Sequence, residues 1–599
     1  MCGIAAHFGF QGPAEPLDLR LIDHRGPDAS GEWISTDSLC WLGSTRLAIL
    51  DLSPTGAQPM VDPVTGNVIV SNGEIYNHRE LRAELGDLGW RGTSDTETIL
   101  LGYRIWGRDL LPRLRGMFAF AIYDRARRQL FVARDRFGIK PLYYVADEHG
   151  VRLGSEIKLL RRPDSQTTPN SIAAYLQWGA SPEAKLIYSE IKTLPAGHAL
   201  TIKGEGECES WRYWPSAKRF VAAPESAPQK VRALLENAVE EHLLSDVPVA
   251  SFLSGGIDSS IVTALAAQRL GSQLQTFTIG FDLPGFDESA IAQQVAELYG
   301  TTHQCLRLSE PEIVQLVKEA VGHLDLPSVD SINTYIASRA VAGKGIKVAL
   351  AGLGGDELFG GYPSFRDVPR LKWIGKLPRA WRRLVGGERL ADLPEKAGTI
   401  ELAHWRRRFC TDEMLTAAGL PNETRKWEAP LELADDFARI SWAELTGYMR
   451  EMLLRDSDQM SMAVSLELRV PFLDHRLVEY SLGLPAVEKL RWGRAKGLLI
   501  EAARDLLPPA VYERPKAGFA LPMTEWMEGP LRSFVAEGLD GVMQLKLVPN
   551  EFVSRLRSQF QGRQLHWTRL WSLVVLGHYL RRNESLGQLD EDPTLHSFA

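Results

Sequence analysis

The chain has little cysteine and no long hydrophobic run. Its 599 residues include five cysteines, and no two of them form a CxxC pair: Cys2, Cys40, Cys208, Cys305 and Cys410. An odd number of scattered cysteines argues against a disulfide framework and against a structural zinc site, so we expect a cytoplasmic protein. No stretch of about 18 apolar residues is present, which argues against a membrane-spanning helix.

An excess of positive charge is also missing, because the net charge is −7 at pH 7. Nucleic acids and anionic membranes attract basic proteins, so this balance predicts neither of them as a partner. The chain is longer than the roughly 250–300 residues at which a single hydrophobic core stops growing. We therefore expect two or more domains.

Cys2 is the most informative residue that is present, because removal of Met1 would make it the amino terminus. The thiol and the free α-amine would then belong to one residue. An α-amine has an ordinary pKa of about 7.7–8.0 and can take the thiol proton near neutral pH. A chance cysteine after the initiator is the alternative, and the residues that follow decide against it.

Up to about Trp214 the sequence has the pattern of short strands and turns. Apolar runs at 117–123 and 129–133 flank a polar turn, and 141–145 is a third such run. This pattern predicts two packed antiparallel sheets.

Polar residues gather in the expected loops of this part. Asn72-Gly73 is a turn signal by itself. Its other interpretation is an oxyanion hole, in which the Asn72 side-chain amide and the Gly73 N–H face one oxygen. Arg46 and Asp95 could bind the carboxylate and the ammonium of a free amino acid, although solvated surface charges are the simpler explanation.

Six motifs in this part resemble the class II glutamine amidotransferase domain, an Ntn (N-terminal nucleophile) hydrolase with an αββα sandwich. They are MCGI at 1–4, HRGPD at 24–28, RLAI at 46–49, NGEIYN at 72–77, SDTE at 94–97 and RDRFGIKPLYY at 134–144. The resemblance implies that Cys2 attacks the side-chain amide of glutamine and releases ammonia, and that water hydrolyses the resulting thioester. It implies that Asn72 and Gly73 form the oxyanion hole. The implied glutamine-binding residues are Arg46, Ile49, Asn72, Gly73, Glu74 and Asp95.

The sequence Tyr213-Trp214-Pro215 and an Ala/Pro/Ser-rich stretch at 221–228 predict a linker at 215–228 between domains at 2–214 and 229–599. Beyond it, an apolar run at 249–253 enters the loop SGGIDSS at 254–260, and an apolar helix follows. A strand, a glycine turn and a helix place backbone N–H groups around an anion. The loop has no Gly-Lys-Ser/Thr, so it is not a Walker A motif. It resembles the pyrophosphate loop of the N-type ATP pyrophosphatases, which release pyrophosphate as they adenylate a substrate.

Two more apolar runs, at 276–280 and 347–352, predict buried strands with helices between them. Alternating strands and helices predict an open parallel α/β sheet with the nucleotide at the carboxyl ends of the strands. The loop LGGDELFGGY at 353–362 follows the third strand. Asp258 and Asp356 could together hold Mg²⁺ on a polyphosphate, and helix capping by both acids is the alternative.

Three further motifs resemble the glutamine-hydrolysing asparagine synthetases: LLRDSDQMSMA at 453–463, ELRVPFLD at 467–474 and RPKAGF at 514–519. The resemblance implies that ATP turns a carboxylate into an acyl-adenylate that ammonia attacks. Aspartate is the first candidate for this carboxylate. The resemblance also implies Lys496 as a catalytic lysine, Mg²⁺ as a cofactor and a homodimer as the candidate assembly. The implied ATP-binding residues are Leu253, Ser254, Gly255, Gly256, Asp258, Ser259, Ser260, Ile279, Ala351 and Gly352.

Leu353 departs from that resemblance, because the family has an acidic residue at this place. A leucine can neither act as a base nor accept a hydrogen bond from an α-ammonium. The β-lactam synthetases have tyrosine here, so Leu353 does not favour them. A carboxylate on a sugar acid, a peptide or a secondary metabolite is therefore the alternative acceptor. Two remoter alternatives, a non-catalytic homologue and a stand-alone glutaminase, conflict with the retained motifs.

The segment 370–439 matches none of these motifs. Basic and aromatic residues interleave in it: Trp373, Arg379, Trp381, Arg382, Arg383 and the run WRRR at 405–408. Such a pattern occurs in sites for nucleic acids or anionic substrates. Because the whole chain is acidic, we expect the solvated faces of amphipathic helices instead.

Overall fold

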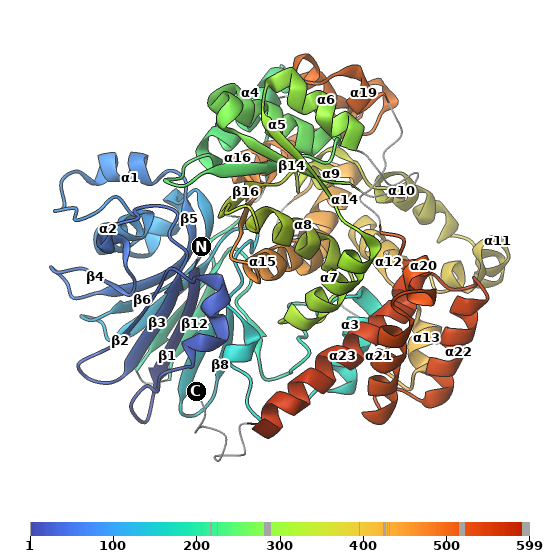
Figure 1. The fold of residues 1–599 in the computed structure, drawn as a ribbon, viewed down its shortest axis with the longest axis horizontal. Coiled ribbons are helices and arrows are strands. Elements are labelled where there is room, and N and C mark those ends of the chain that lie inside the picture. The colour runs from blue at the N-terminus through green and yellow to red at the C-terminus, as the bar shows by residue number, and fades with distance from the viewer. Residues whose placement is uncertain are drawn as a thin grey trace.

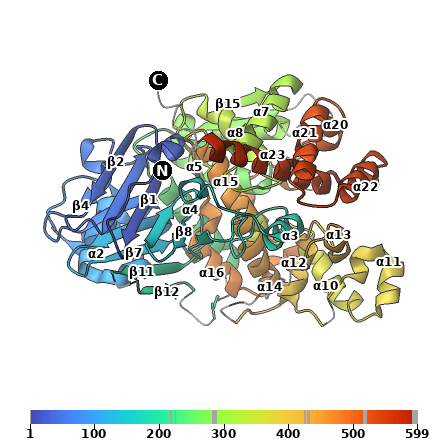
Figure 2. The same cartoon turned by 90° about the horizontal axis from the view of Figure 1, so that it is seen from below.

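The computed structural model describes residues 2–204, 206–215, 219–223, 226–280, 289–394, 396–422, 427, 429, 432–513 and 521–589. The RPKAGF motif at 514–519 and part of the predicted linker lie outside these ranges. A β-rich part and a larger part with many helices lie side by side in both views (Figures 1 and 2).

Two six-stranded antiparallel sheets form the β-rich part. In spatial order the first sheet contains β10 (Lys192–Thr193), β8 (Tyr143–Ala146), β9 (Gly150–Gly154), β1 (Cys2–Gly9), β3 (Cys40–Arg46) and β2 (Ala29–Ile34). The second contains β12 (Cys208–Arg212), β11 (His198–Lys203), β7 (Gln129–Arg134), β6 (Gly116–Asp124), β5 (Val68–Ile75) and β4 (Met60–Val61).

The two sheets pack through one apolar layer. Alternate residues of a strand point to the same face, so Ile4, Ala6 and Phe8 of β1 enter this layer with Val68 and Val70 of β5. On the outer face of the second sheet lie α1 (His78–Leu85) and α2 (Asp95–Trp106). The predicted pair of packed antiparallel sheets is confirmed.

The second part is built around a five-stranded parallel sheet, as predicted. The three predicted strands form its centre, and the two edge strands were not predicted. The spatial order is β15 (Thr302–Arg307), β14 (Gln275–Gly280), β13 (Val249–Phe252), β16 (Val348–Leu350) and β17 (Glu467–Arg469).

Helices surround this sheet and extend away from it (Figure 1). The helices that precede the loop at 353–362 are α3 (Pro169–Trp178), α4 (Ala227–His242), α5 (Ile257–Leu270), α6 (Ser289–Tyr299), α7 (Glu310–His323) and α8 (Ile332–Ala342). Next come α9 (Gly355–Phe359), α10 (Ser364–Ile374), α11 (Arg379–Ala391), α12 (Thr399–Arg407), α13 (Asp412–Ala417), α14 (Asp436–Glu444) and α15 (Arg455–Met462). The last are α16 (His475–Gly483), α17 (Ala486–Lys489), α18 (Gly497–Ala502), α19 (Pro509–Tyr512), α20 (Met523–Glu528), α21 (Arg532–Gln544), α22 (Asn550–Gln561) and α23 (Trp567–Leu589).

One long helix crosses the second part. A π-helical segment, Leu445–Leu454, joins α14 directly to α15. Wider π turns often occur at functional positions. Leu453 of this segment and Ser457 of α15 line a cavity that is described below.

The two parts share a continuous hydrophobic core. Leu47 and Ile49 of the β-rich part belong to the same buried cluster as Val249 and Leu253 of the parallel-sheet part. Polar contacts cross the same boundary, since the Asp51 backbone N–H donates to an Asp246 carboxylate oxygen at 2.8 Å. Among the helices in the described ranges, none is long and apolar enough to cross a membrane.

Two candidate active sites

Cys2 lies at the start of β1 and is almost fully buried. Its backbone nitrogen donates to Asn72 Oδ1 at 3.3 Å, which connects β1 of one sheet to β5 of the other. Burial raises the pKa of the Cys2 thiol, while the nearby amino terminus, the Leu47 backbone and Arg46 lower it. The thiol therefore needs a local base to become a nucleophile.

Asn72 is placed to serve two groups with one side chain. Its Oδ1 accepts from Cys2, and its Nδ2 is buried with no hydrogen-bond partner among the described residues. A buried donor without a partner is costly, typically by about 1–3 kcal/mol. Gly73 follows with φ +151°, and a Cβ there would lie 2.0 Å from the Met117 carbonyl oxygen. These features fit an oxyanion hole beside the thiol.

Arg46 ends β3 directly opposite Cys2 in the β1–β3 register. Its guanidinium donates to the carbonyl oxygens of Ser53 and Leu50, both at 3.3 Å, and to that of Asp51. Arg46 therefore orders the loop that follows β3 and stays half-buried beside the thiol. Ile49 is buried in the core below this loop.

Two buried carboxylates, Glu74 and Asp95, lie near each other in this region, and the charge of Glu74 acts on the Cys2 thiol. Asp95 opens α2, and its carboxylate accepts from the backbone N–H of Ile75 at 2.8 Å and of Thr96 at 2.9 Å. Burial raises the pKa of Asp95 to about 6. Burial, with Asp95 as a like-charged neighbour, raises the pKa of Glu74 well above its ordinary value. Cys2, Arg46, Asn72, Gly73, Glu74 and Asp95 are thus brought together.

Sequence reasoning missed two residues of this pocket. Gln58 Nε2 lies 3.9 Å from Cys2 Sγ and 3.4 Å from Thr96 Oγ1. Arg25 belongs to the HRGPD motif, and its Nε donates to the Cys2 carbonyl oxygen at 3.4 Å. The motif was a signal for Arg25, whereas no local pattern pointed to Gln58.

The SGGIDSS loop connects β13 to α5, as predicted. Ser254 Oγ and Ser259 Oγ lie 3.0 Å apart, and the Gly256 N–H donates to Ser254 Oγ at 3.4 Å. Gly256 is the N-cap of α5, and no side chain caps this helix end. Backbone N–H groups at a helix N-terminus favour an anion.

Lys496 connects the two loops that carry the predicted metal ligands. Its ammonium donates to the carboxylates of both Asp258 and Asp356. Lys496 is 6% exposed, so it is not a surface lysine. Its pKa is raised because the attraction of Asp258 and Asp356 outweighs the opposing effect of burial. A Cβ at Gly361 would lie 1.7 Å from an Asp356 oxygen and 2.6 Å from Lys496 Cε, so only glycine fits there.

The residues present fit a magnesium ion that shares its ligands with a phosphate. Two carboxylates converge on one ammonium, so their oxygens already lie close together. Within the described ranges no group of three or more His, Cys, Asp or Glu residues could hold a metal ion alone. Mg²⁺ accepts one or two carboxylates together with phosphate oxygens and water.

A cavity of about 220 Å³ opens beside the SGGIDSS loop. Four predicted ATP-binding residues line it, namely Leu253, Ser254, Ile279 and Ala351. Leu353, Leu453 and Leu468 make another part of the wall apolar, and Asn333, Thr334 and Ser457 add polar groups. The acidic side chain missing from position 353 would have lined this same cavity.

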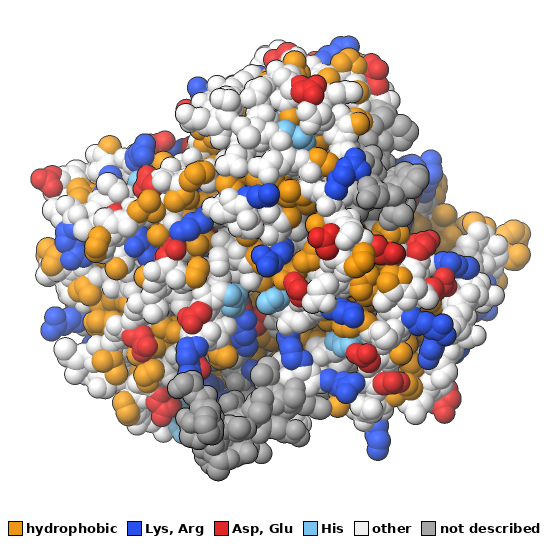
Figure 3. Space-filling model, in the orientation of Figure 1, with side chains coloured by type: hydrophobic (Ala, Val, Ile, Leu, Met, Phe, Trp, Pro, Cys, Tyr) orange, Lys and Arg blue, Asp and Glu red, His pale blue; other side chains and the backbone are white. Residues whose placement is uncertain are grey.

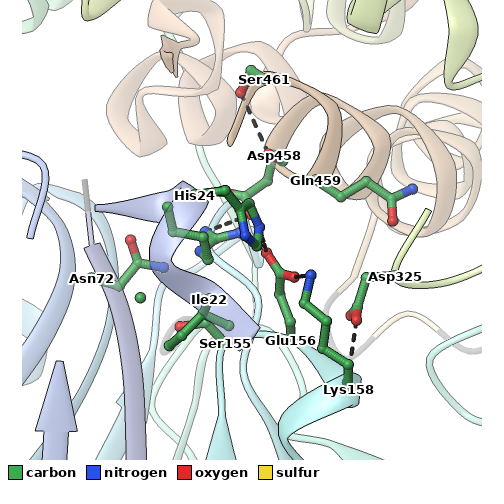
Figure 4. A network of polar contacts seen from close by, with 12 residues as sticks. Ile22, His24, Asn72, Ser155, Glu156, Lys158, Asp325, Asp458, Gln459 and Ser461 are labelled. Carbon is green, nitrogen blue, oxygen red and sulfur yellow. Dashed lines mark hydrogen bonds and ion pairs between the residues drawn. The ribbon is translucent and has the colours of Figure 1, made fainter. Parts of the chain in front are cut away.

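Buried ion pairs connect the two sites across the boundary between the parts. Arg25 has no exposed surface and pairs with Glu156 at 2.9 Å and with Asp458 of α15 at 2.8 Å. Figure 4 shows Glu156 between His24 and Lys158, with Asp458 approaching from α15. Asp458 follows Ser457 of the cavity wall. Arg25 thus contacts both the Cys2 backbone and the helix that lines the cavity.

Two protein families match this chain. The family described as asparagine synthase matches residues 230–581, and the glutamine amidotransferase domain matches residues 1–214. Glutamine-hydrolysing asparagine synthetase 1 of Bacillus subtilis is 32% identical, over 96% of either chain. Amidase chry2 of Gibberella zeae is 28% identical, over 90% of this chain and 91% of its own. The chain therefore belongs to the asparagine synthase family, and its first 214 residues are a glutamine amidotransferase domain.

Proposed function

We propose that this chain makes an amide from a carboxylate, with nitrogen from glutamine and with ATP as the source of activation. The observation that carries the proposal is the buried Nδ2 of Asn72 beside Cys2. Such a donor is expected where negative charge develops on an oxygen during a reaction. The sequence-derived roles of the other site residues are retained as parts of this proposal.

In the glutamine pocket, loss of Met1 leaves the Cys2 nitrogen as an α-amine that takes the thiol proton. The thiolate attacks the side-chain carbon of glutamine, and Asn72 Nδ2 and the Gly73 N–H stabilise the oxyanion. The same amine returns a proton to the departing nitrogen, so ammonia leaves and a thioester remains. Water then hydrolyses the thioester to glutamate. Arg46 binds the carboxylate of glutamine and Asp95 its ammonium.

In the second site, an oxygen of the acceptor carboxylate attacks the α-phosphorus of ATP, and pyrophosphate leaves. Ammonia then attacks the acyl carbon, and AMP leaves. The SGGIDSS loop binds phosphate oxygens, and Lys496 stabilises the growing negative charge. Asp258 and Asp356 would hold Mg²⁺, which supplies charge neutralisation on the polyphosphate.

Aspartate is the acceptor that the family resemblance favours, so the first candidate product is asparagine. Leu353 in the cavity wall supports a second candidate, which is the same chemistry on a carboxylate without an α-ammonium. The relatives include proteins named asparagine synthetases and proteins named amidases. Pyrophosphate exchange into ATP, measured with aspartate and a panel of other carboxylic acids, decides between these acceptors.

The two-site scheme is tested with Cys2→Ala. This variant should lose all glutamine-dependent product, because the nucleophile is gone, and should keep synthesis with added ammonia. Asp258→Ala should do the reverse, losing pyrophosphate release and keeping glutaminase activity. Equal loss with both nitrogen donors in Cys2→Ala would refute the scheme.

The domain limits 2–214 and 229–599 with the linker 215–228, the homodimer and the cytoplasmic location stay predictions from the sequence. Size-exclusion chromatography with light scattering measures the assembly directly.

A further inference from the structure

A lobe built from α10, α11 and α12 lies at the end of the molecule farthest from the β-rich part (Figures 1 and 2). It has its own small core, which includes Val368, Leu371, Leu402 and Trp405. Neither candidate active site uses this lobe. It contains the basic and aromatic segment that the family motifs do not explain.

Helix α11 differs from an ordinary surface helix in which of its side chains are buried and which are exposed. Arg382 is 1% exposed, and its guanidinium donates to the Leu393 carbonyl oxygen inside the lobe. Three large apolar side chains, Trp381, Leu384 and Val385, are exposed instead. Arg379 and Arg383 of this helix are exposed, as expected for a solvated face, whereas the burial of Arg382 departs from that expectation.

Five exposed apolar residues lie close together in the sequence, between the end of α10 and the first turns of α11, and we call them the Trp381 face. Trp381, Leu384 and Val385 share a helix face, because residues three and four positions apart are neighbours on a helix. Figure 3 shows hydrophobic atoms at the right-hand edge, where Figure 1 places α11. The members and their exposed fractions are Trp373 72%, Leu377 41%, Trp381 63%, Leu384 83% and Val385 63%. Contiguous exposed apolar surface on a folded protein marks an interaction site.

The segment that carries the Trp381 face has charge of one sign in its own sequence. Residues 370–387 contain no Asp or Glu, and their exposed cations are Arg370, Lys372, Lys376, Arg379 and Arg383. Lys376 lies 4.4 Å above the Trp373 ring, so cationic and apolar groups are intermixed. The pairs of Lys372 with Asp436 at 3.0 Å and of Arg379 with Asp392 at 3.7 Å involve exposed lysine and arginine side chains. Such exposed pairs are weak.

We propose that the Trp381 face binds an anionic lipid surface. A helix that presents Trp and Leu between Lys and Arg side chains has the composition of an interfacial membrane contact. A second copy of the chain fits less well, because it would bring two sets of cations together. Nucleic acid fits less well because Leu377, Leu384 and Val385 offer aliphatic surface rather than stacking surface. The net charge of −7 does not oppose this contact, since fields are screened beyond about 8–10 Å at physiological salt.

The experiment uses the full chain and sedimentation with vesicles of phosphatidylcholine, with or without phosphatidylglycerol. We expect binding to the anionic vesicles, with a blue shift of tryptophan fluorescence, and weak binding to the neutral ones. Trp381→Ser with Leu384→Ser should weaken binding at least about tenfold, because apolar contact is lost. Arg379→Gln with Arg383→Gln should weaken it and reduce its dependence on salt.

A matched control is available elsewhere on the surface. Trp492 and Val487 are 64% and 74% exposed outside the lobe, so Trp492→Ser with Val487→Ser should bind as the wild type does. The melting temperature and glutaminase activity of each variant report on folding. Failure of the wild type to bind anionic vesicles overturns the proposal, as does equal binding by the Trp381 variant. Dimerisation, or binding of single-stranded RNA, that depends on this face without vesicle binding would also overturn it.

Discussion

In the glutamine pocket a buried amide donor of Asn72 has no hydrogen-bond partner in the described part of the chain, whereas in the second site the ammonium of Lys496 is already held by two carboxylates. In the first site this buried N–H without a partner is costly before any ligand binds. In the second site the ammonium and the two carboxylates neutralise one another, so the polyphosphate and metal that we propose would have to exchange these partners. The first site is therefore tested by removing the amide donor of Asn72, and the second by removing the ammonium of Lys496 that neutralises the two carboxylates.

Replacement of Lys496 should have the largest effect. Lys496→Ala should lower pyrophosphate exchange into ATP by about a thousandfold, because a fixed charge near the phosphates is lost. Glutaminase activity should persist. Without the ammonium, Asp258 and Asp356 repel each other, so Mg²⁺ alone should raise the melting temperature more than in the wild type. Exposed Lys344 provides the control Lys344→Ala, and undiminished exchange in Lys496→Ala would contradict the assignment.

Replacement of Asn72 should come next. Asn72→Ala should lower the kcat of glutamine hydrolysis by about a hundred- to a thousandfold, the usual effect of losing one oxyanion donor. Synthesis from ammonia should be unchanged. Asn77→Ala is the matched control in the same motif, because its amide donates to the Arg113 carbonyl oxygen at 2.9 Å. If both variants hydrolyse glutamine equally well, Asn72 is not an oxyanion donor.

The pH dependence of kcat/KM for glutamine should test the role of Asp95 in the glutamine pocket. Asp95 has its pKa raised to about 6 by burial, so it is ionised above that pH and neutral below it. A neutral carboxyl no longer attracts the ammonium of glutamine. We expect kcat/KM for glutamine to fall about tenfold per pH unit below about pH 6. A profile that stays flat down to pH 5 would remove Asp95 from this role.

The smallest effect is expected at the boundary between the two sites. Asp458→Asn leaves Arg25 and Lys140 without their shared carboxylate, and one broken buried pair typically costs about 3–5 kcal/mol. The melting temperature should fall by a few degrees, and glutamine-dependent synthesis should fall more than ammonia-dependent synthesis. Asp505→Asn removes an exposed pair with Arg232 at 2.9 Å and should change neither. An unchanged melting temperature in Asp458→Asn would show that the pair contributes no net stability.

Patterns of adjacent residues in the sequence predicted the candidate site residues that lie within short motifs. Cys2 was predicted from its position after Met1, and the Asn72-Gly73 pair and the SGGIDSS loop were predicted from short runs of neighbouring residues. The edge strands β15 and β17 were missed for physical reasons. β15 has exposed positions along its length, and β17 has three residues of which two are charged, so neither resembles a buried strand.

Contacts between residues far apart in the sequence could not be predicted from patterns of adjacent residues. The bond from Cys2 to Asn72 spans 70 positions, and the pair of Arg25 and Asp458 spans 433. Periodicity also could not show which face of α11 points inward. Arg382 lies inside because a carbonyl of the following loop accepts its guanidinium, and that position is set by the tertiary structure.

The backbone of Lys496 has a conformation that is unusual for a residue with a side chain. This residue has φ +58°, a left-handed conformation that costs a non-glycine residue about 1–2 kcal/mol. Its N–H is held by the Phe359 carbonyl oxygen at 2.9 Å, so the conformation is imposed by the surrounding fold. Glycine at this position would relax the backbone and remove the ammonium. Glycine would, however, also leave the carboxylates of Asp258 and Asp356 without their shared cation, and breaking a buried pair typically costs about 3–5 kcal/mol. This loss exceeds the backbone gain, so selection for heat resistance alone would retain Lys496.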